Sequence, residues 1–197
     1  MYTHKPSPPL LVYKLDIKLN SKPSFSVTLD NSAVKGFTDF AKQPGAKIYL
    51  LMGEKLDATV YYVGETIQPM QERFRDGINV KKEKCYSWAE SETKYRLFVW
   101  NLEAVGGGRP LKSIEAELVF CVRVAQKAWP KAQTGINFHH LVDAGGYQHS
   151  PYIALDLLSQ TYGDLMQRAN AAGNAERVAS LKIEAADAIE LLKNLVF

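Results

Sequence analysis

The sequence has few cysteines and histidines, and neither residue type is spaced as metal ligands are. Cys85 and Cys121 are its two cysteines, and they lack the short paired spacing of a zinc site. His139 and His140 are adjacent, so on a strand they would point in opposite directions and would not bind one metal ion together. Two cysteines in 197 residues exclude a disulfide-rich secreted domain and favour a reduced, cytoplasmic location.

Long apolar runs and a strong charge excess are also missing. No apolar run approaches the roughly 18 residues that cross a bilayer, and the first residues lack the charged-then-apolar plan of a secretory signal. The sequence therefore predicts no membrane partner. A net charge of +3 permits an anionic partner without requiring one. With 46% hydrophobic residues, a chain of 197 residues is long enough to bury a sizeable core.

Strand and helix patterns alternate along the chain. Strands are expected over residues 10–19, 24–29, 47–52, 59–63 and 95–102, where apolar residues alternate or form short β-rich runs. Helices are expected over residues 31–40, 69–77, 113–129, 151–172 and 175–196. Asn31–Ser32 and Ser113 are expected as helix caps, and Pro69 suits a first helical turn.

These elements predict an α+β fold in which helices flank a small antiparallel sheet. An arm, a hairpin and a short helix are expected over residues 1–45 and a central domain over 46–142. A C-terminal helical extension over 143–197 would pack on that domain. Its last helix carries an apolar seam at steps of three and four, formed by Val178, Leu181, Ala185, Ala188, Leu192 and Leu195. The seam allows two interpretations, packing within the chain or a homodimer through the C-terminal helices.

Four residues of the central segment form a set able to hydrolyse a phosphodiester bond. Tyr49 and Tyr62 lie on neighbouring expected strands, whereas Arg73 and Glu115 lie on the two helices that follow. A carboxylate binds a divalent cation through oxygen, and arginine offers a fork of donors to phosphate oxygens. A tyrosine hydroxyl orients an attacking water or takes its proton. Each of these residue types is also common in cores and on surfaces, so only order and spacing give the set weight.

The order and spacing resemble those of the GIY-YIG nuclease superfamily over about residues 46–140. An Ile-Tyr strand is followed after twelve residues by Tyr-Val-Gly and a threonine, then by a helix that opens with an apolar residue and an arginine. A later glutamate stands three positions before an apolar pair. The matching residues are Lys47-Ile48-Tyr49, Tyr62-Val63-Gly64-Glu65-Thr66, Met70, Arg73, Glu115 and Leu118-Val119.

The resemblance implies a metal-dependent endonuclease and a role for each residue of the set. Tyr49 and Tyr62 would position the attacking water or act as general base. Arg73 would bind phosphate, and Glu115 would be the single ligand of Mg²⁺ or Mn²⁺. Gly64 would be the glycine of the second motif, where the missing Cβ allows close approach. The implied partner is nucleic acid, DNA rather than RNA.

Further candidates for nucleic-acid binding follow Arg73 in the sequence. They are Arg75, Lys81, Lys82 and Lys84, together with Asn137, which resembles an asparagine that ends the family's site. A basic cluster of this kind is also typical of an ordinary solvated face. The cluster alone therefore does not decide between the two interpretations.

Three departures keep alternatives open. Lys47 replaces the first glycine of the motif, and Gly77 stands where many relatives carry a histidine or tyrosine, a role left to Tyr61 or Lys84. Glu117 competes with Glu115, because two positions on a helix point about 200° apart and only one faces a given site. A catalytically weak or inactive nucleic-acid or protein-binding module is thus the alternative function. An interaction protein built on its C-terminal helices is a third.

Overall fold

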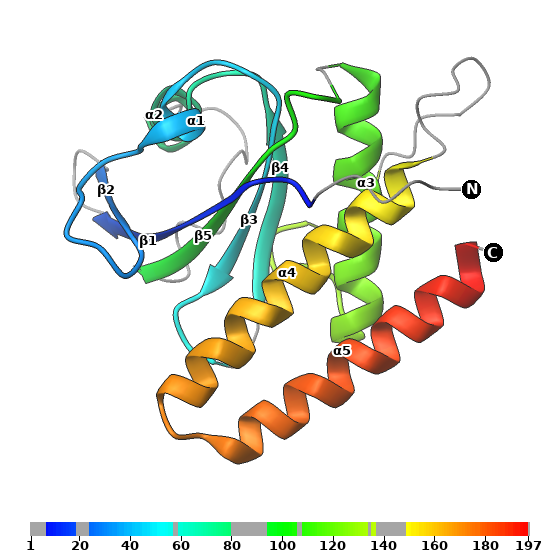
Figure 1. Cartoon of the computed structure of the whole chain (residues 1–197). Helices are drawn as coiled ribbons and strands as arrows, with labels where there is room; N and C mark the ends of the chain where they lie inside the picture. Colours follow the sequence, from blue (N-terminus) through cyan, green and yellow to red (C-terminus); the bar gives the residue numbers. More distant parts are fainter. Residues whose placement is uncertain are drawn as a thin grey trace.

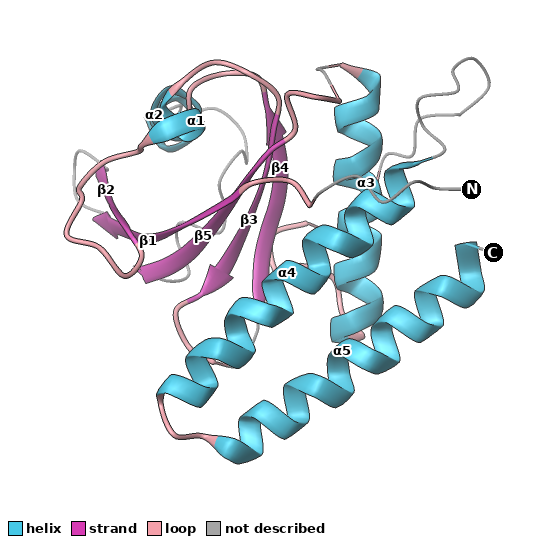
Figure 2. Cartoon of the chain, in the orientation of Figure 1, coloured by secondary structure: helices cyan, strands magenta, loops and turns pink. Residues whose placement is uncertain are grey.

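One antiparallel sheet organises the chain. The computed structural model describes residues 7–18, 24–56, 59–79, 94–105, 108–133, 135–136 and 149–196. The sheet has the strand order β2-β1-β5-β3-β4, and helices cover both of its faces (Figure 1, Figure 2). The strands are β1 (Leu10–Lys18), β2 (Ser24–Leu29), β3 (Lys47–Gly53), β4 (Val60–Thr66) and β5 (Lys94–Asn101). The helices are α1 (Asp39–Lys42), α2 (Met70–Asn79), α3 (Arg109–Gln126), α4 (Ser150–Ala171) and α5 (Ala175–Val196).

The predicted α+β class and all five strand segments are confirmed, with ends that shift by a few residues. The N-terminal hairpin is part of the central sheet, because β1 pairs with β5 as well as with β2. β3 pairs with β5 on one side and β4 on the other, which leaves β4 at an edge of the sheet. The division into segments at residues 45 and 142 stays a prediction.

Two expected helix starts are wrong. The segment after Asn31 turns instead of forming a helix, because Asn31 takes a left-handed φ of 56° and Ser32 Oγ accepts a hydrogen bond from the Val34 amide. Helix α1 is correspondingly short. Helix α3 begins at Arg109, four residues before Ser113, because Pro110 fits the first turn and needs no N–H partner there. Ser113 is therefore buried inside the helix and caps nothing.

The two faces of the sheet hold separate hydrophobic clusters. On one face, Ile48, Leu50, Phe98 and Trp100 pack against α3, α4 and α5. On the other face, alternate residues of the same strands pack against Met70 and Phe74 of α2 and against Phe37 and Ala41; they include Tyr13, Tyr49, Leu51, Leu97 and Val99. The alternation along β3 thus sends Tyr49 toward α2 and its neighbours Ile48 and Leu50 toward α3.

The apolar seam of α5 packs within the chain. Leu181, Ala185, Ala188 and Leu192 are buried, and α5 lies against α4 and α3 (Figure 1). The interpretation of internal packing is therefore confirmed for these residues, and a homodimer would need a different surface of the helix. In the described part of the chain, no helix is long and apolar enough to span a membrane.

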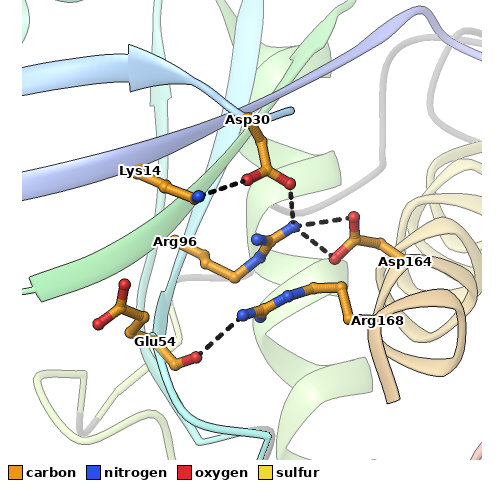
Figure 3. A network of polar contacts seen from close by, with 6 residues as sticks. All are labelled: Lys14, Asp30, Glu54, Arg96, Asp164 and Arg168. Atoms are coloured by element: carbon orange, nitrogen blue, oxygen red, sulfur yellow. Dashed lines mark hydrogen bonds and ion pairs between the residues drawn. The ribbon is translucent and has the colours of Figure 1, made fainter. Parts of the chain in front are cut away.

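A buried arginine joins the hairpin, the central sheet and α4 (Figure 3). Arg96 of β5 is 1% exposed, and its Nη2 donates to Asp30 Oδ2 at 3.0 Å and to both oxygens of Asp164 at 2.9 Å. Asp30 ends the hairpin and Asp164 lies on α4. Lys14 Nζ is 3.6 Å from Asp30 Oδ1, and Arg168 Nη2 donates to the Glu54 carbonyl at 3.2 Å.

Burial and pairing act in opposite directions on the two carboxylates. Burial works against the ionised form of Asp30, but the hydrogen bond and charge of Arg96 outweigh it and lower the pKa of Asp30. At Asp164 the effect of burial is the larger one, so the pKa of Asp164 is raised although the charge and hydrogen bond of Arg96 act to lower it. A buried ion pair adds little to the free energy of unfolding. Removing one partner lowers that free energy strongly, because the other charge stays buried without compensation.

We expect Asp164→Ala to lower the free energy of unfolding by about 3 kcal/mol, because Arg96 then stays buried with only one carboxylate. Urea denaturation at neutral pH measures this change. The matched control is Asp187→Ala on the exposed side of α5, which should change the same quantity by less than about 0.5 kcal/mol. Equal effects of the two substitutions would show that the cluster does not hold α4 on the sheet.

Candidate functional site

Tyr49 of β3 and Arg73 of α2 are directly bonded. Arg73 Nε donates a hydrogen bond of 3.2 Å to Tyr49 Oη. The helix that carries Arg73 is oriented by its first residues, since Thr66 Oγ1 accepts from the Gln68 amide and the Pro69 carbonyl accepts from the Arg73 amide. The sequence from Thr66 to Arg73 therefore positions the guanidinium against the strand.

Gly64 of β4 lets two tyrosine rings converge. It lies directly opposite Tyr49 in the sheet, and the ring centres of Tyr49 and Tyr62 are 6.1 Å apart. A Cβ atom at Gly64 would overlap the hydroxyl end of Tyr49 and approach Tyr62 Cε1 to 2.7 Å. The glycine is thus required by the close approach of these two side chains.

The two tyrosines differ in exposure. Tyr49 is fully buried, in contact with Phe74 of α2 at a ring distance of 5.8 Å, whereas Tyr62 is half-buried. In this conformation Tyr62 is the tyrosine that reaches solvent. Tyr49 lies behind it and contacts Arg73.

Glu115 lies on α3, at the side of the sheet opposite α2. Burial, with the like charge of Glu65 added, raises the pKa of Glu115 to about 7, and the charges of Arg73 and Lys112 act against this rise. Glu65 is on β4 opposite Ile48, on the α3 side of the strand. The edge strand β4 therefore has Tyr62 and Gly64 toward α2 and Glu65 toward Glu115, and the charge of Arg73 acts on Glu115 across it.

The structure separates Glu115 from Glu117. Burial alone raises the pKa of Glu117, and neither Glu65 nor Arg73 contributes. The charge of Glu117 acts instead on Cys121, where burial first and Glu117 second raise the thiol pKa to about 12. Glu115, unlike Glu117, is thus within the electrostatic influence of Arg73, and Cys121 is a buried thiol that stays protonated.

A cavity of about 280 Å³ opens beside Glu115. It is lined by Lys112, Glu115, Ala116, Val119, Gln133, Gly135 and Ile136. Tyr49, Tyr62 and Arg73 do not line this cavity. Arg73 is linked to Glu115 by charge around β4.

Gln133 is a site residue that no pattern in the sequence indicates. Its side-chain Oε1 accepts from the Val63 amide and its Nε2 donates to the Val63 carbonyl, both at 2.8 Å. The backbone amides of Lys131 and Ala132 also donate hydrogen bonds to β4, to the carbonyls of Val60 and Tyr61. This segment occupies the outer side of β4 and fixes Val63 between Tyr62 and Gly64.

Lys47, the departure at the first motif position, has a structural role. It is 1% exposed, and its Nζ donates to the carbonyls of Gly45 at 2.8 Å and Gln68 at 3.2 Å. Burial lowers the pKa of Lys47, and the charge of Glu103 acts against this. The lysine ties the loop before β3 to the residues before α2, and so supports the helix that carries Arg73.

The remaining candidates are only partly covered by the structure. Arg75 is exposed on α2 and lies 3.6 Å from the neighbouring Asp76 carboxylate. Tyr61 is buried in the same cluster as Tyr49, with its hydroxyl accepting from Lys131 Nζ at 3.1 Å, and its role in place of the residue missing at Gly77 stays a prediction. Outside the described residues lie Lys81, Lys82, Lys84 and Asn137.

The described donor set suits a magnesium-like ion. Among the described residues, no group of three or more His, Cys, Asp or Glu side chains is placed to hold a metal ion. Mg²⁺ needs fewer protein ligands, because it keeps several waters and uses one or two carboxylates with substrate phosphates. Glu115 fits such an ion, since a carboxyl that burial and Glu65 keep protonated would ionise more readily beside a cation.

No family model, curated protein or solved structure matches the chain. The resemblance to GIY-YIG nucleases therefore rests on the motif residues themselves.

We expect Glu115→Gln to stabilise the metal-free protein at pH 8 by about 2 kcal/mol, since a raised pKa costs about 1.4 kcal/mol per unit. Below the ordinary pKa of glutamate both folded and unfolded states are protonated and the cost vanishes. The cost grows as pH rises and is complete above pH 7. Denaturation at pH 4.5 and pH 8 measures it, with the exposed Glu190→Gln as control. A gain that is the same at both pH values would contradict the burial of a charge at Glu115.

We expect Gln133→Ala to lower the free energy of unfolding by about 1–2 kcal/mol, because two hydrogen bonds are lost. Hydrogen exchange of the Val63 amide should accelerate, since its acceptor is removed. NMR measures the exchange, and the exposed Gln167→Ala on α4 is the control. Unchanged exchange at Val63 would show that Gln133 does not hold the strand.

Proposed function

We propose that the chain is a GIY-YIG-type endonuclease that hydrolyses phosphodiester bonds in DNA with the help of a divalent cation. The observation that carries the proposal is the Arg73–Tyr49 bond beside Tyr62 and Gly64, with Glu115 within the electrostatic influence of Arg73. Contacts join Tyr49, Tyr62, Gly64 and Arg73, and charge relates Glu115 to Arg73, although these residues are separated by up to sixty-odd positions in the sequence. The low cysteine content makes a cytoplasmic location part of the proposal.

Each side chain has a role that follows from its position. Arg73 Nε donates to the Tyr49 hydroxyl, which fixes the position of the guanidinium, and a guanidinium is the group that binds phosphate oxygens with a fork of donors. Tyr62, half-buried at the edge strand, orients the attacking water and takes its proton. Tyr49 acts through Arg73 and is a positioning residue in this conformation.

Glu115 would hold the cation at the cavity of about 280 Å³ beside α3. When bound, Mg²⁺ or Mn²⁺ supplies a more acidic water and stabilises developing negative charge. Lys112, exposed at the same cavity, adds a positive charge for the DNA backbone.

A second candidate is a nucleic-acid-binding module without catalysis. Two observations favour it: Tyr49 is fully buried, and the cavity beside Glu115 is not lined by Tyr49, Tyr62 or Arg73. It predicts salt-sensitive binding of DNA without strand cleavage. The nuclease is the better supported proposal, because a binding surface does not need a half-buried carboxyl at a cavity with a second carboxylate, Glu65, close enough to raise its pKa.

We expect the protein to nick supercoiled plasmid in Mg²⁺ or Mn²⁺ at pH 8. Arg73→Ala and Glu115→Gln should each slow nicking at least about 100-fold, because each removes a group that stabilises charge in the transition state. Glu117→Gln, on the same helix, is the matched control and should keep the rate within about threefold. Binding without any nicking would support the second candidate, and nicking that Glu115→Gln leaves intact would sink the assignment of the metal ligand.

A further inference from the structure

A second, larger cavity lies at the other end of β4. Its volume is about 880 Å³, within the range of cavities that bind ligands. The carboxyl end of α3, the start of β4, α4 and the amino end of α5 surround it. Its polar and aromatic walls include Gln126, Lys127, Trp129, Lys131, Tyr162 and Arg177.

The cavity carries a surplus of positive charge. Arg177 is compensated internally, since its Nη1 bonds Glu184 Oε1 at 2.5 Å and its Nε donates to the Leu56 carbonyl at 2.7 Å. Lys127 and Lys131 both line the cavity and are exposed, and Lys131 Nζ also donates to the Tyr61 hydroxyl at 3.1 Å. The negative end of α3 and the positive end of α5 both face this region and offset each other. The two lysines therefore set the sign of the charge.

Trp129 offers a fixed aromatic surface. The guanidinium of Arg123 lies 4.2 Å from the centre of its ring, which holds the ring in place. Trp129 lines the cavity and Arg123 does not, so part of the ring faces the empty space. Tyr162 lies deeper, and burial raises its pKa to about 12, which keeps its hydroxyl neutral and able to donate a hydrogen bond.

One short segment connects this cavity to the candidate site. Lys131 lines the larger cavity and its amide bonds the Val60 carbonyl of β4. Two residues later, Gln133 lines the cavity of Glu115 and bonds Val63. A strand of nucleic acid that follows the segment from Lys131 to Gln133, which covers the outer side of β4, would meet both cavities in turn.

We propose that the larger cavity binds an unpaired nucleotide of the DNA strand, with its base against Trp129 and its phosphates at Lys127 and Lys131. The inference rests on the proposed function and adds a substrate class to it: DNA with a single-stranded stretch next to the cut. Aromatic rings stack with any base and lysines neutralise phosphates, so the site would not select sequence. A base inside a duplex is stacked on both sides and enters a cavity only after leaving the stack.

The test is fluorescence anisotropy of the full chain with a labelled single strand and with the duplex of the same sequence, in EDTA to prevent cleavage. The double variant Lys127→Gln/Lys131→Gln should weaken single-strand binding at least tenfold and lower the slope of log affinity against log salt by about 1.4. Trp129→Ala should weaken it at least fivefold and Trp129→Phe much less. The matched control is Lys182→Gln/Lys193→Gln, which removes two exposed charges from α5 and should have little effect.

The outcomes separate this inference from the nuclease proposal. Tighter binding of the single strand than of the duplex, lost in the cavity variants and kept in the control, supports the inference even if plasmid is never nicked. Plasmid nicking with single-strand affinity unchanged in both cavity variants overturns the inference and leaves the nuclease standing. Tighter binding of a matched RNA strand would overturn the assignment to DNA.

Discussion

The arrangement of the described chain depends on one buried cation. Arg96 lies in the central strand β5 with 1% of its surface exposed, where an unpaired charge would cost several kcal/mol. Its partners come from the end of the hairpin, Asp30, and from α4, Asp164, far apart in the sequence. Folding that satisfies Arg96 must bring both segments to the sheet. Helix α4 in turn supports α3 and α5, and β5 supports β3, so the positions of Tyr49 and Glu115 both trace back to this cluster.

The candidate site depends on β4 being an edge strand. Successive side chains of a strand point to opposite faces, and only at an edge does one short segment present both faces to the same solvent region. Tyr62 and Gly64 thus meet the α2 side while Glu65 meets Glu115 on the α3 side. An edge also exposes unpaired backbone groups that invite association with another strand. Gln133 and the residues before it satisfy several of these groups, which protects the edge while leaving the side chains accessible.

The sequence predicted the strands well because their signal is local, a period of two in apolar residues. It misplaced the start of α3 because Ser113 has the chemistry of a cap, whereas Pro110 and the packing of the first turn decide the start. Glu115 and Glu117 were inseparable on a helical wheel. The choice depends on how the packed face of α3 turns against β4, which is a tertiary property. The contacts of Gln133 and of Arg96 could not be predicted from the sequence for the same reason, since their partners lie some seventy positions away along the chain.

The residue types of the site help to distinguish a set of side chains that only fills the core from one that binds a ligand. A strand face that served only as core would favour a larger residue than Gly64 and an apolar one in place of Tyr49. A helix face that served only as core would have no reason to hold a carboxyl whose pKa is raised to about 7. Gly64, Tyr49 and Glu115 are thus less favourable for packing than larger or apolar residues would be. They lie in contact, or within electrostatic influence of Arg73, around β4. Perturbed groups gathered in this way are typical of sites where a ligand offsets the cost. A divalent cation beside Glu115 and a phosphate beside Arg73 are the ligands whose charges would do so.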